Sequence, residues 1–201
     1  MANLYQQAKF AFSANDRKQL PATSQREVAF VGRSNAGKSS ALNTLTQQKN
    51  LARVSKTPGR TQLINYFTLP LPDCYLVDLP GYGYADVPAA IQAHWQKLLG
   101  DYLLQREPLR GVVLLMDIRH PLKELDYQML DCCLARQLPA HILLTKADKF
   151  GSSQQQKQLA AVRTALRDYG GGDLITVQLF SSLKRFGLEA LVQQLDGWYE
   201  R

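Results

Sequence analysis

The stretch Gly32–Ser39, GRSNAGKS, has the glycine, lysine and serine spacing of a phosphate-binding loop. An apolar run, 28–31, precedes it, and a helix-like segment begins at Ser40. Glycines let the backbone turn with its amides inward, and the helix adds free N–H groups and the positive end of its dipole. Lys38 would neutralise the outer phosphates, and the Ser39 hydroxyl would ligate Mg²⁺. We therefore expect a nucleotide site, the alternative being a glycine-rich turn with an incidental lysine.

The sequence Asp78-Leu-Pro-Gly81 follows a second apolar run, 74–77. A carboxylate here could hold a water of the magnesium shell, and the Gly81 amide could approach the terminal phosphate closely because glycine has no Cβ. On its own, such a sequence is equally a turn at the end of a strand. Its place after the third predicted strand favours the nucleotide site.

The sequence Thr145–Asp148, TKAD, follows another apolar run and bears on the identity of the base. Guanine presents two adjacent donors, N1–H and the 2-amino group, and one carboxylate accepts both. Adenine offers no such pair, so Asp148 would select GTP over ATP, with the methylene stem of Lys146 covering the base. A backbone N–H of Phe180–Ser182, assigned by position only, could recognise the guanine 6-oxo group.

A polar, basic loop begins at Lys49 and includes Thr57-Pro-Gly-Arg-Thr61. A threonine hydroxyl in this loop could complete the magnesium shell only when a γ-phosphate is present, which would order the loop in one nucleotide state. The loop is therefore a candidate switch, and the alternative is a plain turn at Pro58-Gly59.

Tyr82 stands where many GTPases place a glutamine that orients the attacking water. Neither Tyr82 nor Tyr84 can do this in the same way, so we expect hydrolysis to be slow or to depend on another element or a partner. The amide oxygen of Asn35 could hold a monovalent cation near the phosphates. An asparagine that stabilises the local turn is the alternative.

The elements that position these residues alternate along the chain. Six strands are expected at about 27–32, 62–69, 74–79, 111–116, 141–144 and 174–180, and helices at about 38–48, 88–102, 122–134, 159–169 and 188–199. A short turn at 70–73 makes one strand antiparallel in an otherwise parallel, doubly wound α/β sheet of the P-loop NTPase type, a three-layer α/β/α arrangement. Ligands of such sheets bind beyond the carboxyl ends of the strands.

The 201 residues suit a single domain, with an irregular or partly helical lead-in (1–26) before the core (27–201). Neither a signal peptide nor an apolar run of membrane-spanning length is evident, and three cysteines form no disulfide framework. We therefore expect a cytoplasmic protein without a membrane span and, as the simplest state, a monomer. A net charge of +7 favours a nucleic-acid partner, although mildly basic proteins without one are common. Cations in two loops could contact phosphate backbone or be plain solvated surface: Arg53, Lys56, Arg60, Lys184 and Arg185.

The combination GRSNAGKSS, TPGRTQLIN, DLPGYGYA, DIRHPL and TKAD resembles the EngB (YihA/YsxC) family of the TrmE-Era-EngA-EngB-Septin-like GTPases, over essentially the whole chain. The resemblance implies a single-domain, Mg²⁺-dependent GTPase that assists assembly of the large ribosomal subunit and is needed for normal cell division and septation. It makes Ser39 and Thr61 the magnesium ligands. Related GTPases with asparagine at the Asn35 position use K⁺. Thr145 stands where the commonest guanine motif has asparagine.

The same resemblance implies contacts to GTP or GDP from five segments. They comprise Gly32, Arg33, Ser34, Asn35, Ala36, Gly37, Lys38, Ser39, Gly59, Arg60, Thr61, Gln62, Leu63, Asp78, Leu79, Pro80, Gly81, Thr145, Lys146, Ala147, Asp148, Phe180, Ser181 and Ser182. Lys38, Thr61 and Asn35 are the residues expected to assist hydrolysis.

We expect GTP and Mg²⁺ to order the loop around Thr61, so that the ordered face binds a ribosomal precursor and hydrolysis releases it. A GTP-gated scaffold in division, with little turnover, is the alternative. A small-molecule kinase is a third possibility, but Asp148 and the lack of an evident acceptor domain count against it.

Overall fold

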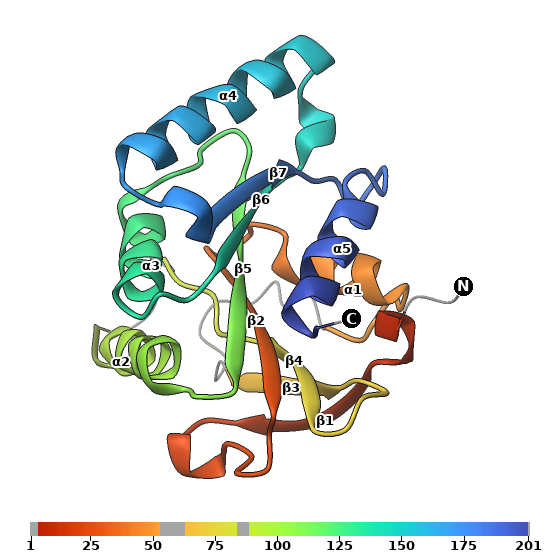
Figure 1. Ribbon diagram of the computed structural model, residues 1–201, viewed down its shortest axis with the longest axis vertical. Coiled ribbons are helices and arrows are strands. Elements are labelled where there is room, and N and C mark those ends of the chain that lie inside the picture. The colour runs from red at the N-terminus through yellow and green to blue at the C-terminus, as the bar shows by residue number, and fades with distance from the viewer. Residues whose placement is uncertain (1–3, 53–62, 84–88, 201) are drawn as a thin grey trace.

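The computed structural model describes residues 4–52, 63–83 and 89–200, in which seven strands form one sheet with helices on both faces (Figure 1). The strands lie in the order β1-β3-β4-β2-β5-β6-β7. β3 is antiparallel to both of its neighbours, and all other pairings are parallel. This architecture confirms the doubly wound, mostly parallel α/β fold expected from the sequence.

The bounds of the expected elements agree with the sequence pattern to within about three residues, except that α4 begins at Ser152, well before the expected start at 159. The strands are β1 Lys9–Ala14, β2 Arg26–Gly32, β3 Ile64–Thr68, β4 Cys74–Asp78, β5 Leu109–Asp117, β6 Ala140–Thr145 and β7 Ile175–Leu179. The helices are α1 Lys38–Thr46, α2 Ala89–Gln105, α3 Glu124–Ala135, α4 Ser152–Asp168 and α5 Leu188–Trp198, with 3-10 turns η1 Leu4–Gln7, η2 Arg17–Gln19, η3 Ala147–Lys149 and η4 Gly172–Leu174. In these ranges, no helix combines the length and the apolar character needed to cross a bilayer.

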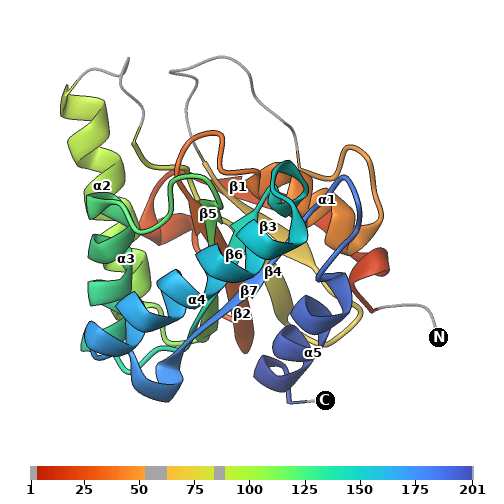
Figure 2. The ribbon, with the colours of Figure 1, turned by 90° about the horizontal axis from the view of Figure 1, so that it is seen from above.

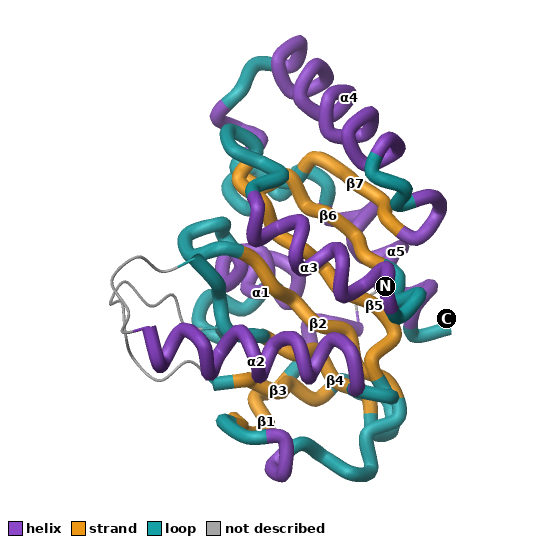
Figure 3. The backbone as a smooth tube through the Cα atoms, turned by 90° about the vertical axis from the view of Figure 1, so that its left-hand side faces the viewer, coloured by secondary structure: helices purple, strands orange, loops and turns teal. Residues whose placement is uncertain are grey.

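Strand β2 lies between the two halves of the core, because successive side chains of a strand point to opposite faces of the sheet. Val28 and Phe30 are fully buried on the face covered by α1 and α5. Ala29 and Val31 are fully buried on the opposite face, under α2, α3 and α4. Figure 2 shows the two groups of helices on either side of the sheet. Figure 3 shows α2 and α3 lying along the second face. The phosphate-binding loop thus follows a strand that both layers hold.

The lead-in was expected to be irregular or partly helical, and the turn η1 agrees with this. It also contains a seventh strand, β1, which was not expected. β1 pairs with β3, far along the chain, and the register shifts between Phe10 and Phe12. The Phe12 ring stacks on Tyr66, with ring centroids 4.8 Å apart. From Lys9 to Ala14 the lead-in reads KFAFSA, without a strict alternation of apolar and polar residues, and its partner strand is 52 residues away (Ser13 to Asn65). A local pattern gives little information about such a distant pairing.

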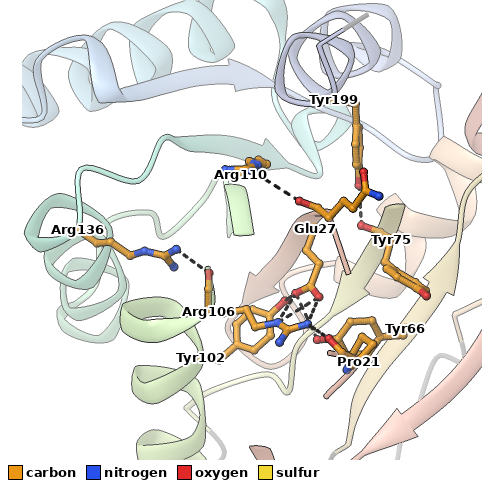
Figure 4. Close-up of polar contacts among 10 residues, drawn as sticks. Pro21, Glu27, Tyr66, Tyr75, Tyr102, Arg106, Arg110, Arg136 and Tyr199 are labelled. Atoms are coloured by element: carbon orange, nitrogen blue, oxygen red, sulfur yellow. Dashed lines mark hydrogen bonds and ion pairs between the residues drawn. The ribbon is translucent and has the colours of Figure 1, made fainter. Parts of the chain in front are cut away.

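A buried ionic cluster stabilises the amino-terminal end of β2 (Figure 4). The Glu27 side chain is fully buried and pairs with the guanidinium of Arg106 at 2.5 Å. The Tyr102 hydroxyl donates to the same carboxylate at 2.5 Å, and Arg106 also donates to the Pro21 carbonyl at 2.7 Å. Burial and the adjacent Glu27 charge raise the pKa of Tyr102 well above its ordinary value. The cluster fixes the end of α2 and the lead-in against the strand whose other end carries the phosphate-binding loop.

Candidate nucleotide-binding site

The motifs expected at strand ends meet at one edge of the sheet. Three of the segments begin at the last residue of a strand: Gly32–Ser39 at the end of β2, Asp78–Gly81 at the end of β4 and Thr145–Asp148 at the end of β6. Phe180–Ser182 directly follows β7. Backbone bonds join the last two segments, since the Ala147 amide donates to the Phe180 carbonyl at 3.1 Å. The structure thus brings together four of the five segments expected at the site.

The fifth segment falls largely outside the described residues. Gly59, Arg60, Thr61 and Gln62 lie there, as does Tyr84, whereas Leu63 immediately precedes β3. The roles expected for Thr61 therefore stay predictions.

The backbone of the phosphate-binding loop requires its glycines. A Cβ at Gly32 would lie 2.7 Å from the carbonyl oxygen of Leu115, so no larger residue fits without a shift. Gly37 has a φ of +89°, which L side chains rarely adopt. Asn35 is exposed and also left-handed, with a φ of 62°, a conformation that asparagine tolerates better than most residues. This geometry agrees with a turn-stabilising role for Asn35 and leaves the potassium role a prediction.

Lys38 and Asp78 form an ion pair at the mouth of the loop, and both side chains are largely buried. The other oxygen of Asp78 accepts from the Asn65 side-chain amide at 3.4 Å, and the Asn65 oxygen accepts from the Ser13 hydroxyl at 2.7 Å. Asn65 and Ser13 were not predicted to orient Asp78. Their positions follow from the pairing of β1, β3 and β4, which the sequence pattern only partly gives.

The donors in this region fit a magnesium ion. Ser39, in the first turn of α1, offers a hydroxyl, and Asp78 offers a carboxylate that could hold a metal-bound water. Mg²⁺ is usually held by one or two oxygen ligands of the protein together with substrate phosphates and water. Across the described ranges, no group of three or more His, Cys, Asp or Glu side chains could hold a metal without such help.

Tyr82 has a structural place that explains why glutamine is absent there. Its side chain is only 6% exposed, and its hydroxyl donates to Asp126 at 2.7 Å. Asp126 is fully buried and also accepts from the Lys123 amide at 2.8 Å, at the start of α3. The Ser34 amide donates to the Tyr82 carbonyl at 2.8 Å, and the Tyr82 amide donates to the Gly32 carbonyl. Tyr82 therefore joins the phosphate-binding loop to α3, and its hydroxyl is engaged with Asp126.

Burial dominates the titration of this pair. It raises the pKa of Tyr82 well above its ordinary value, and the charge of Asp126 raises it further. Burial also raises the pKa of Asp126, against the opposing effect of its hydrogen bonds from Tyr82 and the Lys123 backbone. The pair therefore acts as a fixed hydrogen bond, with the proton on the phenol.

The segment Thr145–Asp148 is braced against the phosphate-binding loop. Lys146 donates to the Asn35 carbonyl at 2.7 Å and pairs with Asp117 at 3.0 Å. Hydrogen bonds from Arg119 lower the pKa of Asp117, despite partial burial, and Lys146 lowers it further. Asp148 accepts from the Ser181 hydroxyl at 2.5 Å, which joins the segments after β6 and β7.

Thr145 makes a brace through its hydroxyl. The side chain is 3% exposed, and Oγ1 lies 2.7 Å from the Ala36 carbonyl and 3.1 Å from the Met116 carbonyl. Its single proton can be donated to only one of them at a time, and the Ala36 contact is the shorter. The threonine thus holds the phosphate-binding loop although it replaces the common asparagine.

Comparisons with known proteins agree with this arrangement. Residues 27–146 match the family model described as "50S ribosome-binding GTPase". The chain is 54% identical over 195 residues to "Probable GTP-binding protein EngB" of Glaesserella parasuis serovar 5 (strain SH0165), covering 97% of this chain and 92% of the relative.

Solved structures share the fold at lower identity. "Crystal structure of a probable GTP-binding protein engB" has a TM-score of 0.67 at 19% identity, covering 87% of this chain and all of that one. A structure of Era in complex with MgGDPNP and nucleotides 1506–1542 of 16S ribosomal RNA also has a TM-score of 0.67, at 20% identity, covering 86% of this chain and 56% of that one.

Proposed function

Because the chain belongs to the EngB family of GTP-binding proteins, we propose that it runs a Mg²⁺-dependent cycle of GTP binding and hydrolysis that serves assembly of the large ribosomal subunit. The observation that carries this proposal is the convergence of the Lys38–Asp78 pair, the phosphate-binding loop and Asp148 on one edge of the sheet. Through family resemblance, the proposal extends to a role in cell division and septation. A cytoplasmic monomer is the state we propose.

The base is selected by Asp148. Its carboxylate accepts the N1–H and 2-amino donors of guanine, and the Ser181 hydroxyl holds it in place. Backbone amides of Phe180–Ser182 receive the 6-oxo group. Lys146 is held between Asn35 and Asp117, so its methylene stem is positioned to cover the base.

When GTP binds, the Lys38 ammonium exchanges its ion pair with Asp78 for one with the phosphates. With Lys38 turned to the outer phosphates, the Asp78 carboxylate would be available to orient a water bound to Mg²⁺, and the Ser39 hydroxyl would ligate the metal. The bound metal supplies positive charge that stabilises the transferred phosphoryl group. Thr61 joins the shell when the γ-phosphate is present, which orders its loop as a switch.

Hydrolysis is slow without help, since the Tyr82 side chain is engaged with Asp126 and cannot orient water. Lys38 stabilises charge on the phosphoryl oxygens. The side-chain amide oxygen of Asn35 is the proposed ligand for K⁺, which would add a further positive charge near the phosphates. A ribosomal partner that completes the site is the other route to faster turnover.

Three observations support a large-subunit precursor, with its RNA and proteins, as the partner: the description of the matched family model, the net charge of +7, and the shared fold with Era, which is solved with ribosomal RNA. Co-sedimentation with large-subunit particles tests this directly. The GTP-analogue form should migrate with the particles and the GDP form should not, at several salt concentrations. Equal migration of the two forms, or none by either, would favour the GTP-gated scaffold in division instead.

A further inference from the structure

The turn that joins β7 to α5, residues 181–187, exposes an unusual group of side chains. Leu183 is 75% exposed and Phe186 is 49% exposed, and the two cations between them, Lys184 and Arg185, are exposed as well. The sequence has no acidic residue between Asp173 and Glu189. Two large apolar side chains exposed beside two cations on one short turn make it a candidate contact surface.

The turn is held firmly by its own backbone. The Ser181 amide donates to the Phe186 carbonyl at 3.0 Å, and the Phe186 amide donates back to the Ser181 carbonyl at 3.1 Å. The Ser181 hydroxyl accepts from the Lys184 amide at 3.2 Å. At Gly187, with a φ of +80°, a Cβ would lie 2.3 Å from the Leu179 carbonyl oxygen. The backbone that carries the exposed side chains is therefore well defined.

The position of the turn places it beside the nucleotide site. Ser181, the first residue of the turn, donates its hydroxyl to Asp148 and accepts from the Lys184 amide. Figures 1 and 2 show the turn at the edge of the sheet where α1 begins. A partner bound here would lie against the guanine end of the site.

We propose that this turn binds a single-stranded segment of ribosomal RNA, with Phe186 stacked on an unpaired base and Lys184 and Arg185 on neighbouring phosphates. An aromatic ring beside two cations matches a base flanked by phosphates, and stacking requires a base that is not enclosed in a duplex. Leu183 covers the sugar or base next to the stacked one. The inference rests on the proposed ribosomal function, for which it names a contact surface.

Binding of a short fluorescent single-stranded RNA, followed by anisotropy at several salt concentrations, tests the two parts separately. Phe186→Ala should weaken binding about tenfold without changing the salt dependence. The matched control is Phe10→Ala, which removes a similarly exposed ring on β1. Lys184→Gln/Arg185→Gln should lower the slope of log K against log salt by about 1.4. Lys157→Gln/Arg163→Gln, on the exposed face of α4, removes the same charge elsewhere.

All variants should keep wild-type affinity for fluorescent GDP, which shows that the fold and the guanine site are intact. Duplex RNA of equal length should compete poorly. The proposal is overturned if the wild type binds no single-stranded RNA, or if the turn variants bind it as well as their controls do. Loss of binding to isolated ribosomal proteins, with RNA binding unchanged, would assign the turn to a protein partner.

Large-subunit particles separate this inference from the proposed function. If the wild type and all variants co-sediment equally in the GTP form, the ribosomal function stands and the turn is not its RNA contact. If the wild type binds the RNA through the turn but never the particles, the surface stands and the ribosomal function fails.

Discussion

Replacing Thr145 by valine removes a buried hydroxyl with almost no change of shape, and so isolates the brace between β6 and the phosphate-binding loop. The hydroxyl lies 2.7 Å from the Ala36 carbonyl, and the side chain is 3% exposed. Without it, the Ala36 carbonyl loses a donor in a site that excludes most water. A buried acceptor left unpaired costs about 1–3 kcal/mol.

For a chain of this length, each kcal/mol shifts the melting temperature by about 2–4 °C, so Thr145→Val should lower it by about 2–12 °C. A bound nucleotide stabilises the phosphate-binding loop of the variant and so restores part of the lost stability. We therefore expect GDP affinity to fall by about five- to tenfold, as for a loss near 1 kcal/mol. Thermal unfolding of the nucleotide-free protein gives the first quantity, and titration with fluorescent GDP gives the second.

Thr145→Ser is the matched control, because it keeps the hydroxyl and removes only the methyl group. It should retain most of the GDP affinity and lose only a small amount of stability through packing. The reasoning is refuted if valine behaves as the wild type does, or if serine is the more damaging replacement. Either result would make the Ala36 contact unimportant and the methyl group the part that matters.

Three further predictions concern other parts of the site and core. Asp148→Asn should shift preference from GTP to xanthosine triphosphate by about 100-fold, since the 2-oxo group of xanthine accepts where guanine donates; an unchanged preference in competition binding removes the argument for base recognition. Tyr82→Phe should lower the free energy of unfolding in urea by about 1–3 kcal/mol, because buried Asp126 loses one of its two donors, and an unchanged value would mean that this contact is not important. Burial lowers the pKa of His141 from 6.5. The unfolded state therefore takes up the proton first, and stability should fall as the pH drops below about 6.5. His141→Gln should reduce that loss in melting scans from pH 7.5 to 5, whereas exposed His120→Gln should not, and equal slopes would contradict the assignment.

The sequence pattern located the main motifs because each is local. A strand, a glycine-bounded turn and a helix occur within Arg26–Thr46, so hydrophobic periodicity and glycine spacing were enough to predict them. The same holds for Asp78–Gly81 and Thr145–Asp148, each of which directly follows or ends a buried strand. The fold and the family are confirmed, whereas the roles of the individual residues in these motifs stay predictions.

The contacts that need distant partners could not be predicted in this way. Asn65 is oriented by Ser13, on a strand that the pattern of the lead-in did not reveal. Asp126 lies within the helix expected at 122–134, where no pattern singles it out, yet it is fully buried and accepts a hydrogen bond from Tyr82. Local composition does not predict either contact. The Ser13–Asn65 contact depends on the order of the strands, and the Tyr82–Asp126 contact depends on the packing of α3.

The carbonyl oxygens of the phosphate-binding loop connect it to the segment Thr145–Asp148. The Asn35 carbonyl accepts from Lys146, and the Ala36 carbonyl accepts from Thr145. The Gly37 carbonyl accepts from the Ala41 amide in α1. Oxygens that accept from the protein are directed away from an incoming anion, so fewer repel it. Two of these three donors belong to the segment that ends in Asp148. If Asp148 binds guanine as proposed, a base that holds Asp148 in place also holds the loop, and we expect guanine recognition and phosphate binding to strengthen each other.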